Sequence, residues 1–209
     1  RANININRCK RLSKEVINRL DLDLTGLTIL TEAATNLFAL TASIAAMAGA
    51  KSVLTIARES NYGSKIEAVE QTLAVAKNFQ CDHIVEVIDD IDSPAIMDVD
   101  IVTNLGALRP LNRKFIEKLK PGAVIPLMFE TWEYRKEDID LDACLEKDIL
   151  VLGTNERYAN VDVLSYVDVI AMKLVLAADV EVYQSNITIL GAGVFAQESQ
   201  KYLLSAGAN

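Results

Sequence analysis

Hydrophobic residues follow two alternating patterns along this chain. Short continuous runs rich in Val, Ile and Leu are typical of buried strands, and longer segments with apolar residues three or four positions apart are typical of helices. The runs predict strands at residues 27–31, 51–57, 83–87, 100–104, 123–127, 149–152 and 187–190. The longer segments predict helices at residues 8–20, 37–48, 64–79, 111–119, 141–146, 161–178 and 197–205.

This alternation predicts an α/β fold with a doubly wound parallel sheet, Rossmann-like or flavodoxin-like, and helices on both faces. The almost continuously apolar strands agree, because both faces of such a sheet are covered. No linker rich in Gly, Ser or Pro interrupts the pattern, so the long helix is expected to connect two sheets. We therefore predict a Rossmann-like substrate domain at residues 1–157, a connecting helix at 158–182, and the beginning of a second Rossmann unit at 183–209.

The last strand leads directly into a glycine-containing loop that is followed by a helix. Its spacing, Gly-x-Gly-x-x-Ala, is that of a dinucleotide-binding turn. The first glycine permits the tight turn, the second lets the backbone approach a pyrophosphate, and the alanine lets the helix lie close to the sheet. The predicted cofactor is NAD or NADP, and the predicted contacts are Gly191, Ala192, Gly193, Val194, Phe195 and Ala196. The alternative is a glycine turn that only packs a helix on a sheet.

The second unit stops at Asn209, where its next strand should begin. The residue that reads the adenosine ribose would follow that strand. We therefore expect the catalytic residues to lie beyond Asn209, and the chain alone to be inactive and to bind NAD(P)H weakly or not at all. The first unit has Glu32-Ala33-Ala34-Thr35-Asn36 in the corresponding loop, and without a glycine it is not expected to hold a pyrophosphate in this manner.

Polar residues follow three of the predicted strands in the first domain. In a parallel sheet, ligands bind at the carboxyl ends of the strands, so these residues are candidates for a substrate site. Arginine is suited to a carboxylate or phosphate ligand. The candidates are Asn104, Arg109, Glu130, Trp132, Arg135 and Asn155. The alternative is a set of surface ion pairs with the tryptophan packed as a lid.

Composition excludes several other classes of protein. A net charge of -8 argues against a nucleic-acid partner, which requires a basic face. No apolar run is long enough to span a membrane, and the first residues lack the apolar segment of a signal peptide. Cys9, Cys81 and Cys144 are far apart and indicate reduced thiols in the cytoplasm. The acidic stretch 89–100 lacks the pattern of a calcium loop, so no metal is expected.

From Asp100 onward the order of motifs resembles the D-isomer-specific 2-hydroxyacid dehydrogenases, also called the formate/glycerate dehydrogenase class. The match is carried by Asp140-Leu141-Asp142-Ala143, by Ile149-Leu150-Val151 and by Thr154-Asn155. It implies a substrate domain, a crossing helix and an NAD domain. The glycine-rich turn that holds the substrate carboxylate in that family is replaced here by residues 128–133, and Asp148 stands where that family usually has glycine. The resemblance implies that the family's catalytic Arg, Glu and His would lie beyond Asn209.

Together these features predict an NAD(P)-dependent oxidoreductase that transfers hydride to or from a small anionic metabolite. Two alternatives remain open: a non-catalytic nucleotide- or metabolite-binding protein on the same fold, and an NAD-using hydrolase or lyase. A strand and a helix bury too little apolar surface to be stable alone. We therefore also expect a homodimer that forms through the apolar side of the helix at 161–178.

Overall fold

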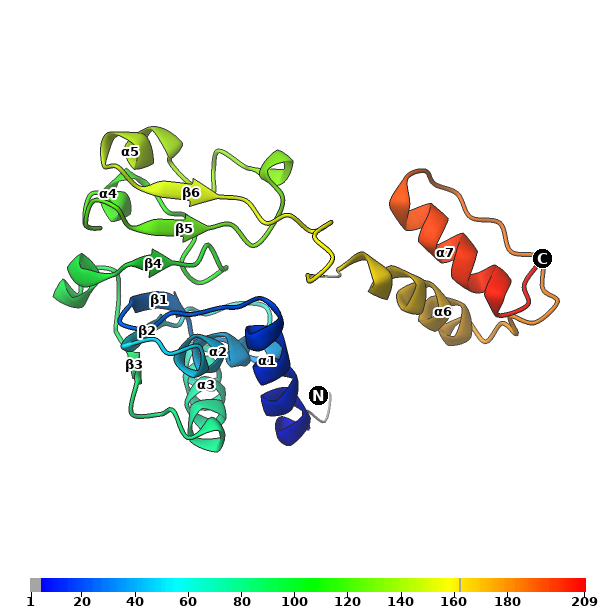
Figure 1. Cartoon of the computed structure of the whole chain (residues 1–209), viewed down its shortest axis with the longest axis horizontal. Coiled ribbons are helices and arrows are strands. Elements are labelled where there is room, and N and C mark those ends of the chain that lie inside the picture. Colours follow the sequence, from blue (N-terminus) through cyan, green and yellow to red (C-terminus); the bar gives the residue numbers. More distant parts are fainter. Residues whose placement is uncertain (1–4, 162) are drawn as a thin grey trace. The chain divides into compact units, whose positions relative to one another are not determined.

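The computed structural model describes residues 5–161 and 163–209 (Figure 1). The chain divides into two compact units, Arg1–Thr154 (unit 1) and Asn155–Asn209 (unit 2). No described helix is long and apolar enough to cross a membrane.

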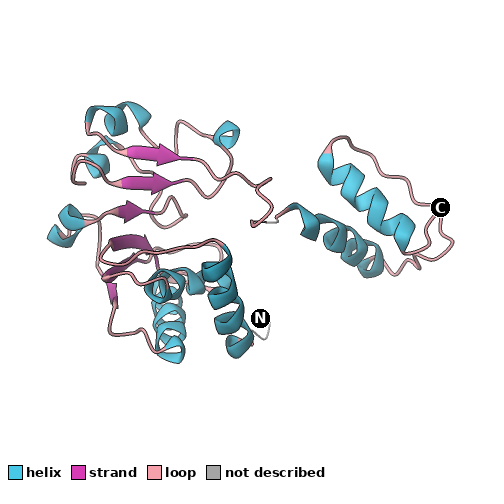
Figure 2. Cartoon of the chain, in the orientation of Figure 1, coloured by secondary structure: helices cyan, strands magenta, loops and turns pink. Residues whose placement is uncertain are grey.

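Unit 1 is built on one sheet of six parallel strands (Figure 2). The strands are β1 (Thr28–Glu32), β2 (Ser52–Ile56), β3 (Val85–Val87), β4 (Ile101–Val102), β5 (Val124–Pro126) and β6 (Leu150–Leu152). Their order is β3-β2-β1-β4-β5-β6, so the chain winds outward from β1 in one direction and then crosses over to continue from β4. This confirms the predicted doubly wound α/β fold and selects the Rossmann order.

One face of the sheet is covered by the helices of the first half. They are α1 (Ile6–Arg19), the 3-10 helix η1 (Asn36–Leu40), α2 (Thr41–Met47) and α3 (Lys65–Phe79). Ile29, Val53 and Val85 point from the strands into this layer and pack in one buried cluster with residues of α1, α2 and α3. Ser64 begins α3 with a reciprocal capping box to Glu67, as the Ser-x-x-Glu spacing favours.

The other face carries the helices of the second half. They are the 3-10 helix η2 (Pro94–Asp98), α4 (Arg113–Ile116) and α5 (Leu141–Glu146). Leu30, Leu54 and Val102 point into this layer, since successive side chains of a strand alternate between the two faces. The largest buried cluster of unit 1 forms here, around Phe115 and Ile125.

The segment predicted as a helix at 111–119 is largely not helical. Asn112 caps a helix of only four residues, α4, by accepting a hydrogen bond from the amide of Phe115 (3.1 Å). Leu111, Phe115 and Leu119 are all buried, so the apolar spacing reflects a segment that turns repeatedly into the core. The predicted helix at 37–48 likewise divides into η1 and α2.

Unit 2 consists of the 3-10 helix η4 (Leu164–Tyr166), α6 (Val167–Ala177) and α7 (Val194–Ser205). Helix α6 packs on α7 around a small core of Val182, Leu203 and Ala208. The helix predicted at 161–178 is shorter here, and its residue 162 lies outside the described residues.

The strand predicted at 187–190 is not formed as a strand. Within the described part of unit 2 these residues have no neighbouring strand to complete a ladder, and Leu190 is 95% exposed. Two hydrogen bonds nevertheless follow the parallel pattern, from Asn209 N to Ser185 O (2.8 Å) and from Ile187 N to Asn209 O (3.3 Å). The segment before α7 and the residues after it therefore have the relative direction of a βαβ unit.

The three cysteines are buried free thiols. Burial raises the pKa of the Cys144 thiol to about 11, so this thiol is protonated at neutral pH. Since the thiolate is the nucleophile, the environment of Cys144 disfavours its reactive form.

Candidate functional site

The carboxyl ends of all six strands of unit 1 meet at one edge of the sheet, because the strands are parallel. Strands β4, β5 and β6, which precede the predicted substrate residues, are consecutive neighbours in the sheet, as expected. The hydroxyl of Thr154 after β6 donates a hydrogen bond to the Leu127 carbonyl after β5 (2.6 Å). This bond fixes the two strand ends relative to each other.

Asn104 lies directly beyond β4 and is 1% exposed. Its Oδ1 accepts a hydrogen bond from the backbone amide of Met128 (2.8 Å) and so joins the ends of β4 and β5. Its Nδ2 is buried and has no hydrogen-bond partner within residues 5–161 and 163–209. A buried amide donor without a partner costs free energy, which makes Asn104 the most unusual of the predicted site residues.

Arg109 is already paired within unit 1. Its Nη1 lies 3.0 Å from Asp138 Oδ2, and both side chains are partly buried. Its backbone carbonyl accepts a hydrogen bond from Arg58 Nη1 (2.8 Å). The guanidinium of Arg109 is therefore paired with Asp138, and this pair joins the loop after β4 to the loop after β5.

Glu130, Trp132 and Arg135 lie in the loop after β5, around the 3-10 helix η3 (Thr131–Glu133). Glu130 and Glu133 form a capping box that begins this turn. Trp132 is 78% exposed and Arg135 is also exposed. The loop thus presents Trp132 and Arg135 to solvent.

Asn155 belongs to unit 2, where its Oδ1 accepts a hydrogen bond from the Arg157 amide (3.1 Å). Of the six predicted substrate residues, unit 1 therefore contains five. Asn104 lies buried under the loops, Arg109 lies in the loop after β4, and the other three lie in the loop after β5.

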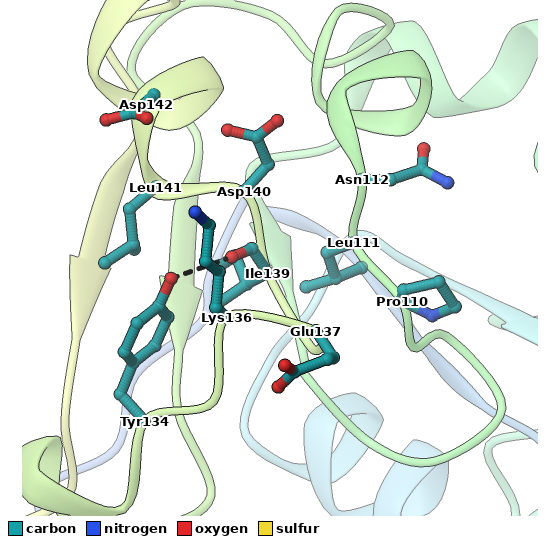
Figure 3. A pocket seen from close by; sticks show the side chains of 10 residues that line it. All are labelled: Pro110, Leu111, Asn112, Tyr134, Lys136, Glu137, Ile139, Asp140, Leu141 and Asp142. Atoms are coloured by element: carbon teal, nitrogen blue, oxygen red, sulfur yellow. Dashed lines mark hydrogen bonds between the residues drawn. The ribbon is translucent and has the colours of Figure 1, made fainter.

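The loops after β4 and β5 also enclose a cavity of about 400 Å3 that contains none of the six predicted residues. Residues 110–112, 134, 136–137 and 139–142 line it, and Figure 3 shows Tyr134 donating its hydroxyl to the Ile139 carbonyl (3.2 Å). Lys136, Glu137 and Asp140 are among the charged residues in its wall. Its formation depends on the parallel pairing of Leu111 with Ile139, two residues in separate loops, which no local sequence pattern indicates.

Glu32 is the functional candidate that the sequence pattern missed. It is the last residue of β1, it is 8% exposed, and its Oε2 accepts a hydrogen bond from the Ala107 amide in the loop after β4 (2.9 Å). Burial raises the pKa of this carboxyl above its ordinary value, against the lowering effects of the Ala107 amide and of Arg109. Strands β1 and β4 flank the point where the strand order reverses, which is where doubly wound sheets bind ligands.

The variant Glu32→Gln should stabilise the protein near pH 7 by an amount on the order of 1 kcal/mol. Folding raises the pKa of the Glu32 carboxyl, so the folded state favours its protonated form. This contribution to stability is fully present below the pKa of the unfolded chain, and it is lost as the pH rises through the pKa of the folded protein. The advantage of the variant should therefore be absent below about pH 4 and present at neutral pH. Urea unfolding at both pH values measures it, with the exposed residue Glu86→Gln as control. An equal effect of Glu32→Gln at both pH values would contradict this explanation.

The glycine loop of unit 2 has the backbone geometry that its sequence suggests. Gly193 has φ +78°, and a Cβ at this position would meet no atom within 4 Å. A Cβ at Gly191 would lie 3.8 Å from the Cβ of Ala196. The first bond within α7 runs from Gln197 N to Gly193 O (3.2 Å), so the preceding amides are not used by the helix itself. Helix amides of this kind, together with the helix dipole, favour a bound anion.

No group of three or more His, Cys, Asp or Glu side chains that could hold a metal ion occurs among the residues that the structure describes. Unit 1 is a doubly wound α/β domain, and the polar groups Glu32 and Asn104 are buried where its strand order reverses. Unit 2 carries a glycine turn of the dinucleotide-binding type.

No protein-family model matches the sequence, and no curated protein matches it significantly. Several solved dehydrogenase structures are similar at low identity. Shikimate 5-dehydrogenase from Listeria monocytogenes, in complex with shikimate and NAD, has a TM-score of 0.48 and 15% identity over 69% of this chain and 51% of that one. The pyruvate reductase of Chlamydomonas reinhardtii has a TM-score of 0.49 and 13% identity over 88% of this chain and 51% of that one. Quinate dehydrogenase from Corynebacterium glutamicum, in complex with NAD, has a TM-score of 0.45 and 12% identity over 70% of this chain and 49% of that one.

The chain spans about half the length of each of these three structures. These structures are shikimate and quinate dehydrogenases and a pyruvate reductase, so the narrower resemblance to the D-2-hydroxyacid dehydrogenases rests on the sequence motifs alone.

Proposed function

We propose that the protein carrying this chain is an NAD(P)-dependent oxidoreductase that transfers hydride to or from a small anionic metabolite, such as a 2-hydroxy acid. The nucleotide binds at residues 191–196 of unit 2, and the substrate binds at the carboxyl edge of the sheet in unit 1. NAD or NADP supplies the hydride chemistry, and the protein binds and orients the two reactants.

The geometry of Gly193 is the observation that supports this function best. Its positive φ favours glycine, and the space where a side chain would stand is free of other atoms. A pyrophosphate can therefore approach this backbone, and the unused amides at the start of α7 can donate hydrogen bonds to it.

Replacement of Gly193 by alanine in the full-length protein should weaken NADH or NADPH binding at least ten-fold. The added Cβ would occupy the space beside the backbone that the pyrophosphate needs, and it would strain the turn. Isothermal titration calorimetry of the wild type and the variant measures the effect.

Gly26→Ala is a matched control for that experiment. Gly26 has φ +81°, and a Cβ there also meets no atom within 4 Å, so the two substitutions cost similar backbone strain. We expect Gly26→Ala to lose stability without losing nucleotide affinity. Equal nucleotide affinities of Gly193→Ala and the wild type, or no binding of either nucleotide by the wild type, would refute the proposal and favour a protein without a dinucleotide.

The homodimer and the cytoplasmic location also remain proposals. Ile170, Leu174 and Leu176 of α6 are about half exposed or more, which supports an apolar contact between two copies through this helix. Light scattering of the full-length protein tests it, and a monomer at high concentration would contradict it.

A further inference from the structure

We propose that Glu32 and Asn104 together bind an alcohol hydroxyl of a small ligand, at the reversal of strand order in unit 1. This rests on the proposed function only in taking unit 1 as the substrate-binding unit, and its test requires no nucleotide.

The two side chains occupy neighbouring positions on one face of the sheet. Leu30 of β1 pairs in register with Val102 of β4, and both belong to the buried cluster on the α4 and α5 face. Continued by two residues, this register places Glu32, the last residue of β1, opposite Asn104, which follows the end of β4. The hydroxyls of Thr31 and Thr103, which lie 2.9 Å apart, support the same register one residue earlier.

Each side chain has one polar atom that its structural role leaves unused. Glu32 uses Oε2 to accept from the Ala107 amide, and its Oε1 accepts no hydrogen bond from residues 5–161 or 163–209. Asn104 uses Oδ1 to accept from Met128, and its buried Nδ2 donates to none of them. The site therefore offers one carboxylate acceptor and one amide donor.

This pair of unused atoms selects a ligand group that can donate and accept at once. A hydroxyl donates its proton to Glu32 and accepts from Asn104 through a lone pair. A carboxylate has no proton to donate, and both carboxylate and phosphate carry negative charge that an ionised Glu32 would repel. An ammonium group has no lone pair for Asn104. The observations therefore point to a hydroxyl group in preference to a charged group.

The loop at residues 105–109 lies directly beside Glu32. It is attached to β1 by the Ala107–Glu32 bond and to the end of β2 by the bond from Arg58 to the Arg109 carbonyl. Gly106 in this loop is exposed, and a Cβ added to it would lie 3.8 Å from Glu32 Oε2. Gly106 therefore has no side chain between the carboxylate of Glu32 and the surface of this loop.

The raised pKa of Glu32 agrees with this role. A buried carboxylate that destabilises the fold at neutral pH is easier to understand if its unused oxygen has a ligand to bind. A bound water is the competing explanation, because it can also donate to Glu32 and accept from Asn104.

The test is saturation-transfer NMR on the full-length protein without nucleotide, using three probes of equal carbon number: 1,2-propanediol, propionamide and propionate. We expect saturable binding of the diol and at least ten-fold weaker binding of propionate. Propionamide also carries a donor and an acceptor, but on separate atoms, and is expected to bind less well than the diol.

Two isosteric variants locate the site. Glu32→Gln retains an acceptor for Ala107, and Asn104→Asp retains the acceptor for Met128 while removing the donor. Each should weaken diol binding at least ten-fold, whereas Glu86→Gln on the exposed side of β3 should leave it unchanged. If a variant does not fold, the Asn104 side-chain amide resonances of the wild type should still shift when the diol is added.

Three outcomes would overturn the proposal: no saturable diol binding, tighter binding of propionamide or propionate, or diol binding that both variants retain. The first would leave an ordered water as the partner of Asn104. Diol binding at Glu32 by a protein that binds neither NADH nor NADPH would support this site while refuting the proposed function.

Discussion

Replacing Phe115 with alanine should lower the free energy of unfolding of unit 1 by about 3–5 kcal/mol, as is usual for a large buried aromatic residue. Phe115 is 1% exposed and lies in the largest buried cluster, where the short helix α4 packs on the sheet. Its removal leaves a cavity that the surrounding strands cannot fill, because their backbones are fixed by hydrogen bonds on both sides.

The matched control for this experiment is Phe38→Ala, since Phe38 is 54% exposed in η1. We expect its effect to be within about 1 kcal/mol. Urea unfolding followed by circular dichroism compares the two variants. Equal losses would mean that the α4 face contributes no more to stability than the surface does.

Replacing Leu203 with alanine should unfold unit 2 selectively. The buried core of unit 2 is one cluster of Val182, Leu203 and Ala208, with partly buried residues packed against it. A buried leucine contributes about 2–5 kcal/mol, which is comparable to the whole stability of a unit this small. Helix α7 should then lose its protection, and nucleotide binding should be lost with it.

Amide hydrogen exchange resolves this prediction by region. We expect exchange in α7 to rise to that of an unfolded segment, while β1, β2 and α3 of unit 1 remain protected. Leu204→Ala is the control, because the adjacent side chain is 52% exposed. Retained protection of α7 in the Leu203 variant would contradict the assignment of Leu203 as the centre of this core.

The fold was largely predictable because its signals are local. Buried strands such as 51–57 and a capped helix such as 64–79 are recognisable from their own residues, and the structure places them as expected. The helix predicted at 111–119 is largely wrong, because the apolar residues of this segment face one core from successive turns. Their spacing is therefore the same as that of one face of a helix. The strand at 187–190 was misassigned because a strand also requires a partner, which apolar composition does not supply.

The candidate site was less predictable because it depends on strand order. The position of Asn104 after a strand predicts it as a site residue. Its buried Nδ2 without a hydrogen-bond partner results from the packing around it, which the sequence pattern does not indicate. Glu32 is important only because β4 lies beside β1, a pairing between residues far apart in the sequence. Residues such as Trp132 and Arg135 were selected for their chemistry, and the structure exposes them.

The contact between β1 and β4 also has a consequence for the order of folding. Three of its bonds, Thr28–Asp100, Thr31–Thr103 and Glu32–Ala107, each join residues at least 72 positions apart, whereas Leu30 and Leu54 of the β1–β2 pair are much closer in sequence. Tripling the length of a loop adds about 1 kcal/mol to the entropic cost of closing it. The two halves of the sheet should therefore form separately and join at this contact late in folding, so that mutations at Thr31 or Thr103 change the unfolding rate more than the folding rate.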